Sequence, residues 1–117
     1  MTVKEAIARA DALRPNTFGE EQKAAWVLDL EGQLAEMFGV EPPRADEWPE
    51  RDTVLMVPHP HDEIYQLLLI CRIDYYNQDM ALYANDQAFY TAALKELKAW
   101  FRRTHRPEDT GRNWRVM

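Results

Sequence analysis

The chain contains no serine, one cysteine and few glycines, and each shortage excludes a class of chemistry. Catalysis by a serine nucleophile is impossible, and the single Cys71 lies in an apolar stretch rather than beside a base. One cysteine cannot form an intrachain disulfide, so we expect a buried, inert thiol in a reducing cytoplasm. None of the four glycines belongs to a glycine-rich repeat followed by Lys-Ser or Lys-Thr. A loop that cradles a nucleotide phosphate is therefore not expected.

Long apolar runs are also missing. No stretch approaches the roughly 18 consecutive apolar residues that a membrane-spanning helix needs, and the amino terminus shows no secretion signal. The 117 residues, of which 46% are hydrophobic and 11% aromatic, suffice for one domain with a core. We therefore expect a single, soluble, intracellular domain without contact to a membrane.

The charges are unevenly distributed along the chain. The formal net charge of −6 argues against indiscriminate DNA binding, which requires a basic surface. Acids outnumber bases in residues 1–50, whereas bases outnumber acids in residues 95–117. The bases of this second stretch are Lys95, Lys98, Arg102, Arg103, Arg106, Arg112 and Arg115. They either complement a helix C-terminus or contact a partner or nucleic acid.

The first helix is predicted from a local signal. Thr2 and Glu5 have the spacing of a capping box, which places a helix start at Thr2. Pro15 disfavours helical geometry in the residue before it, so this helix should end near Leu13 or Arg14. Its apolar residues recur at helical spacing: Val3, Ile7, Ala10 and Leu13.

A second helix and a proline-rich connection follow. Thr17 and Glu20 repeat the capping-box spacing, and Gly39 supplies a stop. The apolar stripe between them is Trp26, Val27, Leu30, Leu34, Met37 and Phe38. From 40 to 60 the helical period disappears into prolines, with one short β-like run at 53–57. We interpret this stretch as a connection packed by Trp48, Leu55 and Val57.

Two further helices are expected to form a long hairpin. The helical period returns at His61 and reaches Leu82, and Asn85 with Asp86 should break it and cap a fourth helix. The predicted buried face of this fourth helix comprises Ala88, Phe89, Ala92, Ala93, Leu97, Trp100 and Phe101. The pattern predicts an all-α domain of about four helices over residues 1–107 and a flexible tail over 108–117.

The strongest hint of enzyme chemistry is the run His59-Pro60-His61-Asp62-Glu63 after the β-like segment. It looks like the His-Pro-Asp-Asp-Glu segment of zinc-dependent sugar N-deacetylases, where a strand end presents metal ligands and a base. Here His61 replaces the expected base, and the only other histidine is His105. Because a zinc site needs three or four placed ligands, we favour a helix start with solvent-facing histidines and expect no metal or cofactor.

Tyrosines are dense in the two last helices: Tyr65, Tyr75, Tyr76, Tyr83 and Tyr90. Tyrosine is favoured where one ring edge is dry and the hydroxyl is wet. Two interpretations follow. The tyrosines border the core of a helical hairpin, or some of them face a neighbouring subunit.

Several segments resemble small proteins of tailed-phage and prophage structural gene clusters, of the head-tail connector or adaptor group. The matching segments are 8–16, 62–65, 73–77 and 103–107, with Tyr83, Asn85 and Phe89 between them. The resemblance implies an all-α subunit that assembles into a ring beneath the portal, with DNA passing through the hole without sequence readout. It implies no active-site residue.

The resemblance also implies the partners and the location of the protein. The partners are further copies of the chain, the portal protein and tail-side connector proteins, first in the bacterial host cytoplasm and then in the virion. Our candidate contacts are Arg102, Arg103, Arg106, Arg112, Trp114 and Arg115, with Trp114 as the anchor of a tail that becomes ordered against a partner. The alternatives are a small zinc-dependent hydrolase using residues 59–63, or an acidic module that binds a host protein.

Overall fold

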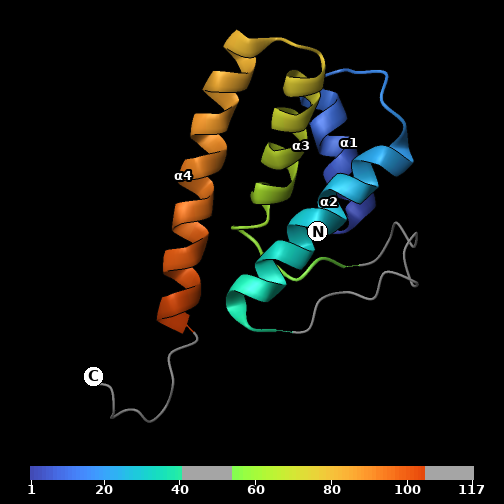
Figure 1. Ribbon diagram of the computed structural model, residues 1–117. Coiled ribbons are helices and arrows are strands. Elements are labelled where there is room, and N and C mark those ends of the chain that lie inside the picture. Colours follow the sequence, from blue (N-terminus) through green and yellow to red (C-terminus); the bar gives the residue numbers. More distant parts are fainter. Residues whose placement is uncertain (41–53, 105–117) are drawn as a thin grey trace, which may run out of the picture.

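The computed structural model describes residues 1–40 and 54–104. It contains four helices: α1 (Val3–Leu13), α2 (Glu20–Phe38), α3 (Glu63–Tyr76) and α4 (Met80–Thr104). The prediction of an all-α domain with about four helices is confirmed. Within the described part β structure is limited to one antiparallel bridge, between Thr2 and Val54. Figure 1 shows α4 at one edge, with α3 between it and α1; α3 is the helix that packs against all the others.

The capping box predicted for α1 is present. The Thr2 hydroxyl accepts a hydrogen bond from the Glu5 backbone N–H at 3.1 Å, and the Thr2 N–H donates to the Glu5 carboxylate at 2.8 Å. The helix ends at Leu13, and the Arg14 N–H still donates to the Ala10 carbonyl at 2.8 Å. Both predicted ends of this helix are therefore confirmed.

Helix α2 begins differently from the prediction. Its N-cap is Gly19, in extended conformation, and no side chain caps the helix, so the capping box expected at Thr17 is wrong. The chain before it is held instead by Asn16, whose side-chain oxygen accepts from the Phe18 N–H at 3.1 Å. At the other end Gly39 adopts a φ of 72°, which glycine reaches without steric cost. The predicted glycine stop is confirmed.

The boundary between α3 and α4 lies earlier than predicted. Helix α3 ends at Tyr76, and Gln78 adopts a positive φ of 62°. The Asp79 carboxylate then accepts a hydrogen bond from the Leu82 N–H at 3.2 Å. It thereby satisfies one of the backbone donors that have no partner within the first turn of α4. Asn85 and Asp86, where we expected the break, lie inside α4.

The core lies between α3 and the other helices. Its largest fully buried apolar and aromatic side chains are Tyr65, Leu34, Ile64, Leu69, Ile73, Leu97, Val3 and Val27. Leu97 is the single fully buried residue of α4. Phe89, which we expected in the buried face, is 59% exposed, and Ala88 and Ala92 are exposed as well. For these three residues the prediction is wrong, because the packed face of α4 is rotated toward Tyr90 and Leu94; the predicted Ala93, Leu97 and Trp100 do pack against the core.

Candidate interaction surface

A buried polar cluster fixes how α4 sits on the other helices. The Arg14 guanidinium lies 3.0 Å from the Asp74 carboxylate of α3 and donates to the Asp86 carboxylate of α4 at 2.6 Å. Burial raises the pKa of Asp74 to about 7, helped by the hydrogen bond with Asp86 and opposed by Arg14. One cation thus joins the end of α1 to both helices of the hairpin. Asp86 has this role instead of the predicted helix cap.

A hollow of about 330 Å³ opens between α2 and α4, with α3 as its floor. Its lining residues are Leu30, Gln33, Leu68, Cys71, Arg72, Tyr75, Tyr76, Tyr83, Gln87 and Tyr90. Arg72 is the only charged residue among them, and no carboxylate of the described residues pairs with it. Burial raises the pKa of Cys71 to about 11, so its thiol is neutral and unreactive near pH 7. We call this hollow the tyrosine groove.

A second hollow, of about 290 Å³, lies at the other end of α4. It is lined by Phe38, Val40, Met56, Val57, Pro58, Trp100 and Phe101. The Phe38 and Phe101 rings stack with their centroids 4.0 Å apart, and this contact joins the end of α2 to the end of α4. The two hollows therefore lie toward opposite ends of α4, beside residues 83–90 and 100–101.

The predicted basic end is present in part. Arg102 and Arg103 are exposed in the last turn of α4, where positive charge complements the helix dipole. Lys95 is exposed about two turns earlier. The other candidate contacts, Arg106, Arg112, Trp114 and Arg115, lie outside the described residues, as does the predicted tail over 108–117.

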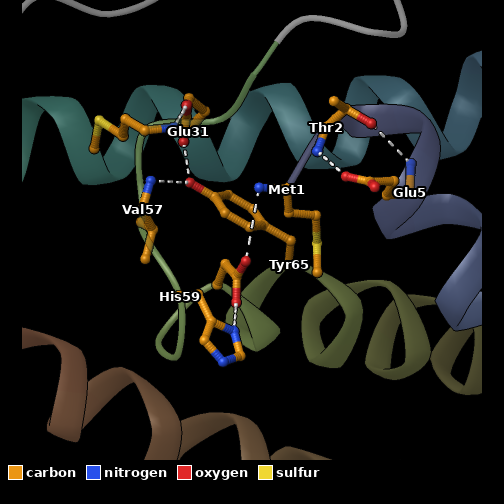
Figure 2. A network of polar contacts seen from close by, with 9 residues as sticks. Met1, Thr2, Glu5, Glu31, Val57, His59 and Tyr65 are labelled. Carbon is orange, nitrogen blue, oxygen red and sulfur yellow. Dashed lines mark hydrogen bonds and ion pairs between the residues drawn. The ribbon is translucent and has the colours of Figure 1, made fainter.

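The His-Pro-His run lies just before α3, and its side chains and the following Asp62 make contacts within the fold. The buried Asp62 carboxylate lies 3.6 Å from the amino group of Met1 and 3.5 Å from Nδ1 of His59 (Figure 2). The His59 side chain is 85% exposed. The His61 ring packs on Trp100 of α4, with centroids 5.1 Å apart. Across residues 1–40 and 54–104, no group of three or more His, Cys, Asp or Glu side chains is placed to hold a metal ion.

A second buried contact holds the segment before α3. Figure 2 shows the Tyr65 hydroxyl between α2 and this segment: it donates to Glu31 at 2.5 Å and accepts from the Val57 N–H at 3.1 Å. The other Glu31 oxygen accepts from the Met56 N–H at 2.7 Å. Burial raises the pKa of Glu31, although both hydrogen bonds oppose the shift. The sequence analysis missed Glu31, although its helical spacing from Val27 and Leu34 places it beside the predicted apolar stripe of α2. What it could not show is the partner, because Tyr65 is 34 positions away.

The five tyrosines take different places. Tyr65 is fully buried, whereas Tyr75 and Tyr76 are about half exposed. The Tyr76 ring stacks on Trp26 with centroids 5.4 Å apart, and Tyr75 contacts Tyr83 at 5.4 Å. The rings of Tyr75, Tyr76 and Tyr83 form the wall of the tyrosine groove at its α3–α4 end. The first interpretation, tyrosines at the border of the core, fits Tyr90, which packs against the core while partly buried. Tyr65 lies wholly inside the core, and the second interpretation remains a proposal for the exposed rings.

In the described part of the chain, no helix is both long and apolar enough to cross a membrane. The comparisons with family models, with curated proteins and with solved structures give no match for this chain.

Proposed function

We propose that the protein is a non-enzymatic structural subunit of a phage or prophage particle, similar to a head-tail connector. It forms a ring under the portal and joins the capsid to the tail. Its partners are further copies of itself, the portal protein and the tail-side connector proteins, and DNA passes through the ring without sequence readout. The resemblance of the quoted segments and the all-α fold support this proposal.

The observation that carries it is the exposure of α4. This helix has 25 residues, of which only Leu97 is fully buried. It packs chiefly on α3 and stands at the edge of the bundle (Figure 1). A helix of this length is stabilised mainly by packing of its faces. The large exposed surface of α4 is therefore typical of a subunit whose neighbours complete the packing.

The charge distribution supports head-to-tail assembly. Asp29 and Glu36 lie two turns apart on the exposed face of α2, opposite its buried residues. Lys95, Arg102 and Arg103 are exposed on α4. A ring uses heterologous contacts, in which each subunit contributes two different, complementary surfaces. Opposite charges on separate helices favour such pairing and its orientation.

Deletion of the gene from an inducible prophage tests the proposal. We expect DNA-filled heads and separate tails that do not join, and wild-type protein supplied from a plasmid should restore complete particles. Mass spectrometry of purified particles should find the protein in virions. Normal infectious particles from the deletion strain would contradict the proposed function.

A further inference from the structure

Phe89 is a large aromatic side chain on a free flank of α4. It is 59% exposed, and no ring of the described residues contacts it. Three residues of α4 line the tyrosine groove: Tyr83, Gln87 and Tyr90. In a helix of 3.6 residues per turn, Phe89 points about 120°, about 160° and about 100° away from them, respectively. Phe89 and the groove therefore lie on different faces of the same helix.

The groove has the chemistry to receive an aromatic ring. Leu30 and Leu68 give it an apolar component, and four tyrosine rings stand in its lining. Aromatic rings pair favourably edge to face, and an arginine near a ring adds a cation–π attraction. Arg72, which has no carboxylate partner in the described part of the chain, can provide this attraction.

The charges beside the two surfaces are also complementary. Glu96 follows Phe89 by seven residues, so it lies on the same flank about 10 Å further along the helix. Glu96 is exposed and has no ion-pair partner among the described residues. On the groove side, Lys98 continues the line of Gln87, Tyr90 and Leu94 at helical spacing. Two parallel copies of α4 set side by side would bring acid and base to similar heights.

We propose that the tyrosine groove binds Phe89 of a second copy of this chain, with Glu96 of that copy facing Lys98. Phe89 is the knob of this contact. Because the knob and the groove lie on different flanks of α4, the contact is heterologous and can be repeated from subunit to subunit. This inference rests on the proposed function and names the subunit contact within the ring. An aromatic anchor in a pocket is the arrangement that dominates binding energy at many interfaces.

Complementation between two full-length variants tests the contact. Phe89→Asp removes the knob and keeps the groove, whereas Gln87→Trp fills the groove and keeps the knob. The control is Ala88→Asp, which adds the same charge at an exposed position about 100° from either flank. Circular dichroism checks that each variant is folded, and Gln87→Arg replaces Gln87→Trp if the latter is not. Sedimentation velocity measures the assembly state.

We expect Phe89→Asp and Gln87→Trp each to weaken self-association roughly tenfold or more, while Ala88→Asp assembles like the wild type. An equimolar mixture of the two defective variants has one intact contact per pair and should form dimers that grow no further. If the wild type forms rings and Phe89→Asp forms the same rings, this contact is overturned and the connector proposal still stands. So would folded variants whose mixture stays monomeric. A wild-type chain that is monomeric at every concentration, alone and with the portal protein, overturns both proposals.

Discussion

Replacing Tyr65 by phenylalanine removes one oxygen atom from the core and leaves the ring in place. That oxygen donates to Glu31 at 2.5 Å and accepts from the Val57 N–H at 3.1 Å. Glu31 is 2% exposed, so water cannot replace the lost donor without rearrangement. A buried group left without its hydrogen bond costs about 1–3 kcal/mol, and more when the group is charged. We therefore expect Tyr65→Phe to lower the free energy of unfolding by about 2–4 kcal/mol near pH 7.

The contribution of Glu31 to the free energy of unfolding depends on pH with a defined sign. Burial raises the pKa of Glu31 above its ordinary value, so the folded state binds the proton more tightly than the unfolded state. The contribution of Glu31 to stability is therefore largest below its ordinary pKa and falls as the pH rises through the raised one. Glu31→Gln should remove this slope while keeping an oxygen that accepts from Tyr65.

Urea unfolding at several pH values, followed by tryptophan fluorescence, measures both effects. A double-mutant cycle of Tyr65→Phe with Glu31→Gln isolates their coupling. A loss below about 0.5 kcal/mol for Tyr65→Phe would show that the buried hydroxyl does not stabilise the fold, because surface substitutions cost as little. An unchanged pH slope in Glu31→Gln would show that Glu31 is not the group that titrates.

Three further predictions concern the packing of α4, the polar cluster and the histidines. Leu97→Ala should cost about 2–5 kcal/mol in urea unfolding, whereas Phe89→Ala should stay within about 0.5 kcal/mol; the reverse order would put the wrong face of α4 in the core. Because burial raises the pKa of Asp74 to about 7, its contribution to stability should fall as pH rises from about 4 to 7, and Asp74→Asn should flatten this fall in melting curves recorded across that range. The double variant His59→Ala, His61→Ala should melt within a few degrees of the wild type, and elemental analysis of the wild-type protein should find no stoichiometric zinc; one tightly bound metal per chain would support the hydrolase alternative instead.

Local signals in the sequence predicted local structure well. The Thr2 and Glu5 capping box and the Gly39 stop involve residues a few positions apart, so their contacts can be inferred from spacing alone. The start of α2 shows the limit of such signals, since Thr17 and Glu20 have the same spacing and form no cap. There the preceding turn, held by Asn16, competes successfully for the backbone.

Contacts between residues far apart in the sequence determine the features that the sequence analysis predicted wrongly or missed. Asn77 to Asp79 and Asn85 to Asp86 are both polar interruptions, and the sequence does not distinguish them. Asp86 stays helical while its carboxylate meets Arg14, 72 positions away, and such a pairing has no local signature. The same holds for Glu31 and Tyr65, which are 34 positions apart. The exposure of Phe89 depends on the rotation of α4, which these distant contacts help to set.

The proposed function requires that this chain assembles with itself into a closed ring beneath a portal. The most direct measurement is native mass spectrometry, with negative-stain electron microscopy, of the full-length protein alone and mixed with the portal protein from its own gene cluster. We expect one dominant oligomer of fixed subunit number, seen as a ring with a central hole and bound to the portal. A protein that remains monomeric under both conditions, or that forms open chains of variable length beside an unbound portal, would contradict it.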